Sequence, residues 1–206
     1  LAASDVSSTM IGTVLGQLVI VAGSPILTRL YTPAELGGLA VFIGLAATLS
    51  VVSSFGYQLA IPLPADRQVA ANVATLAATV ALISSILITL VALGFGPLDE
   101  AGGVGGLLWL LGPCVLAISG FQILFMWTTR EGKFRGAGIA RIVQATTQVL
   151  GQLGAGVVRF GLIGLVGAYV VAQFTGIVGL WKTSRIPSTG VSRHRMVSAA
   201  IRYRKF

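Results

Sequence analysis

Charged residues, histidine and cysteine are scarce in this sequence, and each shortage excludes a structural or functional feature. Only 10% of the 206 residues are charged, whereas charged residues make up roughly a quarter of an ordinary soluble domain. The single cysteine, Cys114, excludes a disulfide within the chain, so cysteine usage does not indicate a compartment. No long apolar segment holds Asp, Glu or His near its centre, which excludes enzymes that need acid–base or metal-binding groups at membrane depth. We therefore expect no enzymatic activity, no catalytic residue, no metal site and no cofactor.

Long apolar segments take up most of the chain, in which 55% of the residues are hydrophobic. A bilayer core of roughly 30 Å needs about 20 residues of apolar helix. Six segments reach that length: residues 9–27, 34–55, 69–95, 104–127, 137–158 and 162–181. They are too long for strands and do not alternate with a period of two. The sequence therefore predicts an all-α polytopic membrane protein, with residues 1–181 as a six-helix transmembrane lobe and residues 182–206 as a basic tail or linker.

Basic residues lie almost entirely on one side of this predicted membrane domain. If the N-terminus is cytoplasmic, twelve of the 14 Lys and Arg residues lie on the cytoplasmic side, and only Arg29 and Arg159 lie outside. Cytoplasmic loops of membrane proteins carry an excess of Lys and Arg. The sequence thus predicts six transmembrane helices with both ends of the chain in the cytoplasm. Membrane topology, rather than nucleic-acid binding, also explains the net charge of +8.

One predicted helix, residues 137–158, carries polar side chains in a regular pattern. Arg141, Gln144, Gln148 and Gln152 are spaced three, four and four residues apart. At about 100° per residue they fall on one face, and Arg159 returns to the same angle. This stripe extends about 16 Å from Arg141 to Gln152, which is half the hydrocarbon thickness. Polar groups that face lipid are costly, so this face is expected to contact protein or a hydrated cavity.

Two interpretations of the stripe remain open from the residues alone. The glutamines either join neighbouring helices by hydrogen bonds, each contributing roughly 1 kcal/mol, or line a path for an anionic, polar substrate. Arginine binds phosphate through parallel hydrogen bonds, and glutamine has donors and acceptors that suit sugar hydroxyls. Isolated polar residues in or near the other spans are interpreted as helix–helix hydrogen-bonding groups: Gln58, Asn72, Gln122 and Gln173.

The first predicted helix has a weaker polar face. Four residues fall within about 60° of one another: Thr13, Gln17, Ser24 and Thr28. A different face suits close helix packing, because it carries Gly12, Gly16 and Gly23. Pro25 is expected to kink the helix near its outer end. Arg29 follows, either as an arginine that reaches the membrane interface or as an anion contact at the mouth of a cavity. Tryptophans near span ends are typical of interfacial aromatic belts: Trp109, Trp127 and Trp181.

Several segments match a known family of membrane proteins in their order and spacing. Residues 27–37 (LTRLYTPAELG) are similar to a first loop of that family, and residues 55–64 (FGYQLAIPLP), continued by residues 70–72, to a second loop. Residues 133–152, which include the stripe, and residues 202–206 (RYRKF) are similar as well. Over nearly its whole length, the chain resembles the polysaccharide and O-antigen repeat-unit flippases of the multidrug/oligosaccharidyl-lipid/polysaccharide exporter superfamily.

The resemblance implies a function in the synthesis of cell-surface polysaccharide such as lipopolysaccharide. It implies that an undecaprenyl-diphosphate-linked oligosaccharide is moved across the cell (inner or plasma) membrane by alternating access between two lobes around a cationic cavity. This chain resembles the first lobe only, so the resemblance also implies a partner, either a second lobe or a second copy in a homodimer. Candidate cavity residues are Arg141, Gln144, Gln148, Gln152, Arg29 and Gln17.

Other functions remain open beside this one. A non-transporting membrane subunit would bind partners through its glycine-rich helix faces and through the basic tail, which also suits an anionic lipid surface. Other members of the same superfamily export drugs or a peptidoglycan precursor, and the residues do not separate these substrates. A membrane-embedded transferase would need catalytic carboxylates, which the predicted spans lack.

Overall fold

The computed structural model describes residues 2–53, 56–64, 66–94, 104–183 and 186, and this part of the chain is helical and contains no strand. Six α-helices follow one another: α1 (Ala2–Leu30), α2 (Pro33–Ser53), α3 (Arg67–Gly94), α4 (Leu111–Arg130), α5 (Phe134–Val157) and α6 (Gly161–Thr183). Two 3₁₀ helices, η1 (Tyr57–Ala60) and η2 (Val104–Leu110), precede α3 and α4. The predicted all-α fold is confirmed. Most of the predicted tail, residues 184–185 and 187–206, lies outside the described residues.

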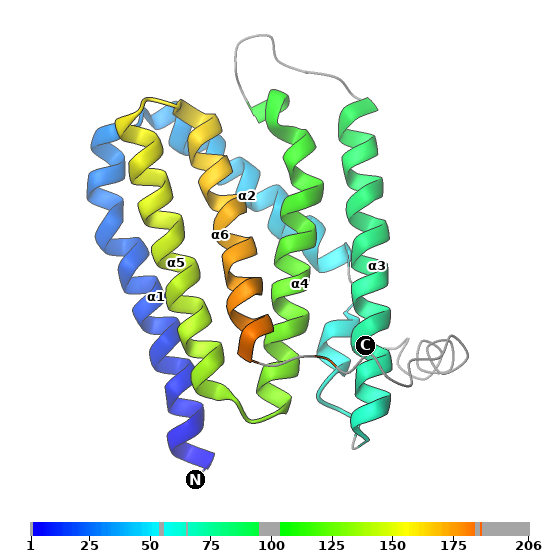
Figure 1. Ribbon diagram of the computed structural model, residues 1–206. Coiled ribbons are helices and arrows are strands. Elements are labelled where there is room, and N and C mark those ends of the chain that lie inside the picture. The colour runs from blue at the N-terminus through cyan, green and yellow to red at the C-terminus, as the bar shows by residue number, and fades with distance from the viewer. Residues whose placement is uncertain (1, 54–55, 65, 95–103, 184–185, 187–206) are drawn as a thin grey trace.

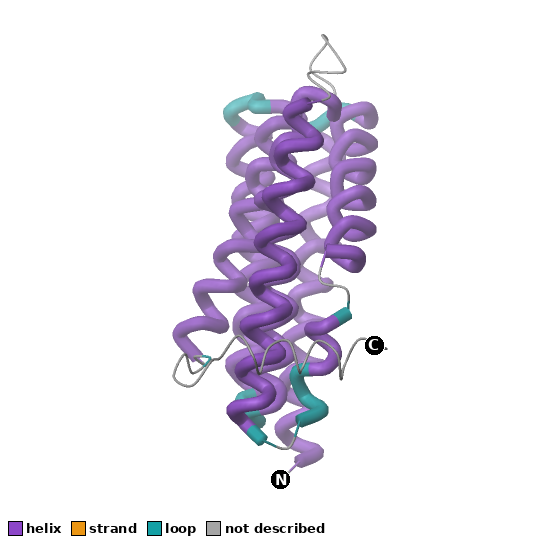
Figure 2. Tube along the Cα trace, turned by 90° about the vertical axis from the view of Figure 1, so that its right-hand side faces the viewer, coloured by secondary structure: helices purple, strands orange, loops and turns teal. Residues whose placement is uncertain are grey.

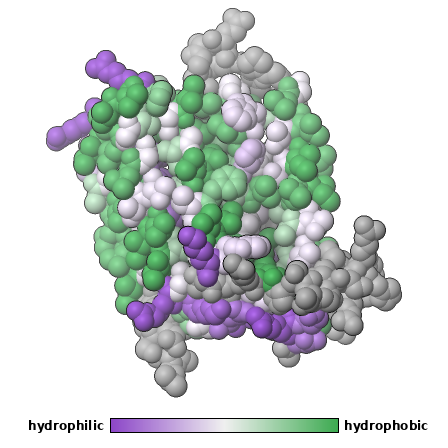
Figure 3. Space-filling view, viewed as in Figure 1, coloured by the Kyte–Doolittle hydropathy of each residue, from purple (hydrophilic) through white to green (hydrophobic). Residues whose placement is uncertain are grey.

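Five helical segments of the described chain are long and apolar enough to cross a membrane, namely those of α1, α2, α3, η2 with α4, and α6. Large apolar side chains face outward on these helices, as on α3, where Leu82, Ile83 and Leu90 are 47–60% exposed. Figure 3 shows this apolar surface over most of one face. A soluble monomer rarely exposes so large an apolar area. The chain is therefore an all-α polytopic membrane protein.

The helix α5 is not among these five segments, because its arginines and glutamines lower its hydropathy. It is placed where protein covers it, since it packs between α1 and α6. The helix α6 packs in turn on α4, and α4 packs on α3, while α2 passes behind α4 and α6 (Figure 1). A polar helix is tolerated in a membrane domain when its neighbours, rather than lipid, meet its polar face.

Consecutive helices run in opposite directions, so their connections alternate between two ends of the bundle (Figures 1 and 2). One end, here called the N-terminal end, holds the start of α1, the η1 segment and the α4–α5 turn. The other, the distal end, holds the α1–α2 and α5–α6 turns. Described basic residues gather at the N-terminal end, as the predicted charge asymmetry requires: Arg67, Arg130, Lys133, Arg135 and Lys182. Which end faces the cytoplasm stays a prediction.

Glycines bring α1 into close contact with α5. A Cβ added at Gly12 would lie 2.3 Å from the Cα of Gly138, so only glycine is accommodated at this crossing. At Gly16 the corresponding Cβ would lie 3.4 Å from the backbone oxygen of Arg141. The Thr9 hydroxyl donates a hydrogen bond to the Phe134 carbonyl, 3.1 Å away, at the same crossing. The predicted glycine face of α1 is therefore its packing face, as small residues allow in membrane helices.

Two prolines act differently from one another. The fourth predicted span begins as the 3₁₀ helix η2, and the α-helix starts only at Leu111. Pro113 lies in the first turn of α4, where its missing N–H would have had no partner within the helix. By contrast, Pro25 lies inside α1, and α1 continues across it as one helix from Ala2 to Leu30.

Candidate functional site

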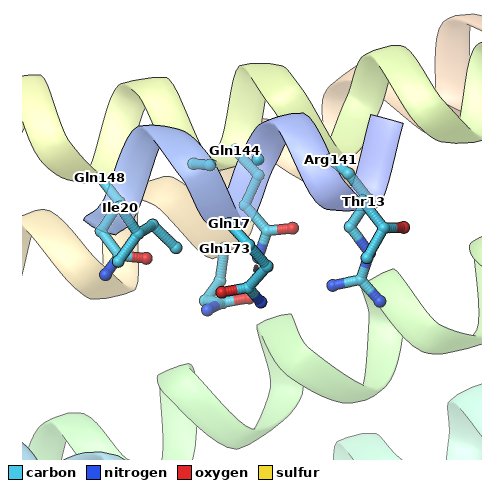
Figure 4. A pocket seen from close by; sticks show the side chains of 9 residues that line it. Thr13, Gln17, Ile20, Arg141, Gln144, Gln148 and Gln173 are labelled. Carbon is cyan, nitrogen blue, oxygen red and sulfur yellow. Dashed lines mark hydrogen bonds between the residues drawn. The ribbon is translucent and has the colours of Figure 1, made fainter. Parts of the chain in front are cut away.

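A polar cavity of about 190 Å³ lies between α1, α5 and α6 (Figure 4). It is lined by Thr13, Gly16, Gln17 and Ile20 from α1, by Arg141, Gln144, Ala145 and Gln148 from α5, and by Gln173 from α6. Three residues of the predicted stripe thus meet Gln17 around one space. None of the lining residues is a carboxylate or a histidine, so the cavity presents binding groups and no acid–base pair.

The cation of the cavity, Arg141, lies over aromatic rings of α4. Its guanidinium carbon is 4.5 Å from the ring centroid of Phe121 and 5.1 Å from that of Phe125. Each such contact contributes about 0.5–2 kcal/mol. The Nε of Arg141 is buried without a hydrogen-bond partner among the described residues. Both ion pairs among the described residues involve Glu131, so the rings orient Arg141 and no described carboxylate pairs with it.

The amides of Gln144 and Gln173 join α5 to α6 beside this cation. The Nε2 of Gln144 donates a hydrogen bond to the Oε1 of Gln173. The Oε1 of Gln144 is buried and has no partner among the described residues. A buried amide oxygen without a donor costs free energy, and a ligand hydroxyl or a water supplies that donor. The pair therefore leaves one acceptor available to whatever occupies the cavity.

The rim of the cavity on the α1 side is polar and exposed. Thr13 and Gln17 line the cavity and are exposed side chains. The rest of the predicted polar face of α1, Ser24 and Thr28, is exposed as well. Two of its hydroxyls donate to carbonyls of the same helix, from Thr13 to Thr9 and from Thr28 to Pro25. The polar face of α1 therefore points away from the bundle, and the cavity opens toward it.

The fourth residue of the stripe, Gln152, does not line the cavity. Only 2% of its surface is exposed, and its Nε2 donates to the Leu165 carbonyl at 3.5 Å. Its backbone oxygen accepts from the Tyr31 hydroxyl at 2.7 Å. Burial, with a smaller contribution from the carboxylate of Glu35, raises the pKa of Tyr31, so this hydroxyl keeps its proton as a donor. Gln152 holds helices together.

The convergence of α5 and α6 explains why Gln152 is buried. Near their connecting turn the two helices approach so closely that a Cβ added at Gly164 would lie 2.6 Å from the Cβ of Ala155. A Cβ at Gly151 would lie 3.0 Å from that of Ala168. The angle of Gln152 on α5 is that of the stripe, but α6 fills the space in front of it.

Two arginines predicted near the path lie at the distal end. Arg29 is exposed near the end of α1, about 13 Å along the helix from Ile20, the farthest cavity residue of α1. Arg159 is also exposed, and it does not continue the stripe, because α5 ends at Val157. Its φ of 61° is left-handed, as is common for a residue just past a helix end. The expectation of an arginine at each end of the stripe was therefore wrong.

Sequence reasoning missed three residues of this site. The predicted helix–helix hydrogen bond of Gln173 is present, but Gln173 also lines the cavity. The sequence does not indicate the contact of Phe121 and Phe125 with Arg141, although their spacing of four residues places both rings on one face of α4. Their role depends on which face of α4 meets α5, and this was not visible in the sequence.

Polar and aromatic residues elsewhere gave mixed outcomes. The Nε2 of Gln58 donates to the Oε1 of Gln122 at 3.4 Å, which confirms the predicted hydrogen-bonding role of this pair. Trp109 and Trp181 are exposed near helix ends, as expected for interfacial residues. Trp127 is fully buried, so its assignment to an interfacial belt was wrong. It packs with Ala60, Ile61 and residues of α3, because the segment that leads into α3 covers it.

Comparisons with protein-family models, with curated proteins and with solved structures find no match for this chain. A function is therefore proposed from the chemistry of the cavity, together with the resemblance of the sequence segments.

Proposed function

We propose that this chain forms one lobe of a transporter that moves a lipid-linked, diphosphate-bearing oligosaccharide across a membrane. The observation that carries this proposal is the state of Arg141. It is a partly buried cation on two aromatic rings, without a described carboxylate partner, and it shares a cavity with the amides of Gln144 and Gln148. An anionic ligand supplies the missing counter-charge, and a lipid diphosphate is such an anion.

The lining chemistry suits a sugar phosphate. Guanidinium groups bind phosphate oxygens through parallel hydrogen bonds. The amides of Gln17, Gln148 and Gln173 offer donors and acceptors to hydroxyls, and Gln144 offers its unpartnered oxygen. A cavity of about 150 Å³ holds a benzene molecule, so one of about 190 Å³ accepts a single sugar ring or a phosphate pair. The remaining sugars would extend past the exposed rim formed by α1.

The open rim supports a transporter of two lobes. Because Thr13 and Gln17 are exposed, this lobe covers the cavity from one side only. In the proposed mechanism a second lobe, in the same chain or in a second copy, faces the rim. The substrate's charged head group passes between the lobes while its lipid remains in the bilayer. The protein makes no covalent change to the substrate.

The test is an export assay in a strain whose own copy of the gene is deleted. Replacement of Arg141 and Gln148 by leucine should abolish export of the polysaccharide and leave the amount of protein in the membrane unchanged. The matched control is Arg135→Gln, which removes an exposed cation from the same helix outside the cavity. Normal export by the double variant would refute the assignment of the cavity.

A second candidate function, a membrane subunit that binds partners without transport, is favoured by the hydrogen bonds of Gln144 and Gln152. Both amides join α5 to α6, as structural residues would. This function predicts that the stripe is closed to water along its whole length, whereas the transporter requires water at Arg141 and Gln148.

A further inference from the structure

A second polar hollow lies at the N-terminal end of the bundle and shares no lining residue with the cavity. This basal groove is lined by Pro62, which precedes α3, by Arg67, the first residue of α3, by Arg130 at the end of α4, and by Glu131 and Lys133 of the α4–α5 turn. Its volume is about 650 Å³. Two segments far apart in the sequence therefore form one surface that the proposed transport cycle does not use.

Hydrogen bonds and ion pairs hold the charged side chains of the basal groove in place, and cations outnumber carboxylates among its lining residues. Glu131 forms ion pairs with Arg67 and with Lys133, whose Nζ is 3.0 Å from the carboxylate. The Nη1 of Arg130 donates to the carbonyl of Pro62 at 3.3 Å and to that of Pro64. Three cations and one carboxylate line the groove, which leaves a net charge of +2. The surface thus favours an anion with more than one acceptor oxygen.

Neutral groups contact both arginines in addition to the Arg67–Glu131 ion pair. The guanidinium carbon of Arg67 lies 5.9 Å from the ring centroid of the buried Trp127, and Arg130 donates to the carbonyls of Pro62 and Pro64. A ring and a carbonyl position a guanidinium without removing its charge. Much of the surface of Arg67 and Lys133 is also accessible, with 65% and 48% of their side chains exposed.

The groove lies where the apolar part of the bundle ends. Arg67 is the first residue of one apolar membrane segment, and Arg130 is the last residue of another. Headgroups occupy this depth in a bilayer. Leu59 and Leu63 are close in sequence to Pro62, which lines the groove, and they are 58% and 55% exposed. A soluble anion makes no use of such apolar surface, but the acyl chains of a lipid do.

We propose that the basal groove binds the phosphate of an anionic phospholipid headgroup, with the acyl chains against Leu59 and Leu63. Basic pockets between helices at the end of a membrane domain recognise anionic headgroups. The lipid is a bound component of the lobe and not its cargo, so the inference does not depend on the proposed transport function.

Native mass spectrometry of the purified full chain tests this inference. The protein is mixed with phosphatidylglycerol or with phosphatidylcholine of the same acyl chains. We expect the unchanged protein to retain phosphatidylglycerol at least about fivefold better. The variant R130Q/K133Q should lose this preference, by about tenfold or more in relative affinity. The control R29Q/R159Q removes the same charge at the distal end and should keep the preference.

A milder variant guards against misfolding. Lys133→Gln changes one exposed side chain and should weaken the preference by about fivefold, with an unchanged thermal unfolding temperature. No preference in the unchanged protein, or an equal loss in the distal control, would overturn the proposal. Displacement of bound phosphatidylglycerol by inorganic phosphate would also overturn it, because the groove would then be a site for a free anion.

Discussion

Arg67 and Arg141 both lie over aromatic rings, but only Arg67 has a carboxylate beside it. Arg67, at the basal groove, is 5.9 Å from the ring of Trp127 and pairs with Glu131. Arg141, in the cavity, is 4.5 Å and 5.1 Å from the rings of Phe121 and Phe125, and no ion pair joins it to a described residue. Arg67 is exposed at the end of the bundle, whereas Arg141 is partly buried inside it.

This difference separates an arginine that has a paired carboxylate from one that has no described counter-ion. An exposed ion pair contributes little to stability, since water already solvates both partners. A partly buried cation without a counter-ion costs stability, because burial removes its water and nothing replaces it. A protein that retains such a residue loses stability unless a ligand binds there. Arg141 is therefore the more informative of the two for function.

The largest effect is expected from a substitution that disrupts the α1–α5 contact beside the cavity and leaves the basal groove unchanged. Gly12→Val places a side chain where a Cβ would already lie 2.3 Å from Gly138 Cα, so α1 must separate from α5. We expect a loss of about 3 kcal/mol or more in the free energy of unfolding, measured by thermal unfolding in detergent. The control Gly37→Val adds a side chain to α2 where nothing lies within 4 Å, and its stability should change little. Equal losses in both variants would contradict the close α1–α5 contact.

Thiol labelling then sharpens the contrast within the stripe. Gln148→Cys should react with a water-borne maleimide at least about tenfold faster than Gln152→Cys, because reactivity follows exposure. Gln152 is 2% exposed and bonded to α6, whereas Gln148 lines the cavity. The unchanged protein supplies the background, since its own Cys114 is buried. Slow labelling at both positions would favour the non-transporting subunit.

A third test removes the charge of Arg141, and its result is to be compared with that of the same substitution at Arg67. Arg141→Met keeps an apolar chain against Phe121 and Phe125 and removes the buried charge. We expect the free energy of unfolding to rise by about 1 kcal/mol, while export is lost. Thermal unfolding would measure the change in stability, and the export assay would measure the loss of transport. A large loss of stability would show instead that the contact of Arg141 with the rings dominates.

The smallest effect is expected at the basal groove. Arg67→Met removes an exposed ion pair and should lower the free energy of unfolding by at most about 1 kcal/mol. The difference from the unchanged protein should shrink further in high salt, because mobile ions screen exposed charges. Thermal unfolding at low and high salt measures both effects. A loss of several kcal/mol, insensitive to salt, would mean that Arg67 is a core structural residue.

Most of the fold was predictable because long apolar segments and short connections leave few alternatives. The helix boundaries agree to within a few residues except at the start of α4, where Pro113 and the preceding glycines give a 3₁₀ helix, and at α1, which begins earlier than predicted. The candidate site was predictable in direction only. Helical spacing placed Arg141, Gln144 and Gln152 on one face, but spacing does not show how near the next helix lies.

Tertiary packing decided the rest of the site. The convergence of α5 and α6 buries Gln152, and the end of α5 at Val157 removes Arg159 from the stripe. The same packing brings Gln173 to the cavity and the aromatic rings of α4 under Arg141. The burial of Gln152, the position of Gln173 and the rings under Arg141 depend on how two helix faces fit together, which a period of 3.6 does not encode.

The hydrogen bond between Gln144 and Gln173 can form in two orientations of the amides, and each presents a different group to the cavity. Rotating both amides by 180° exchanges their oxygens and nitrogens, so Gln173 becomes the donor and Gln144 the acceptor of an equivalent bond. The group of Gln144 left over for the cavity then changes from an oxygen to an N–H. One pair of side chains, without moving its backbone, can thus present either an acceptor to a sugar hydroxyl or a donor to a phosphate oxygen. If the proposed transport function holds, such a cavity wall would suit both the sugar and the phosphate parts of the head group.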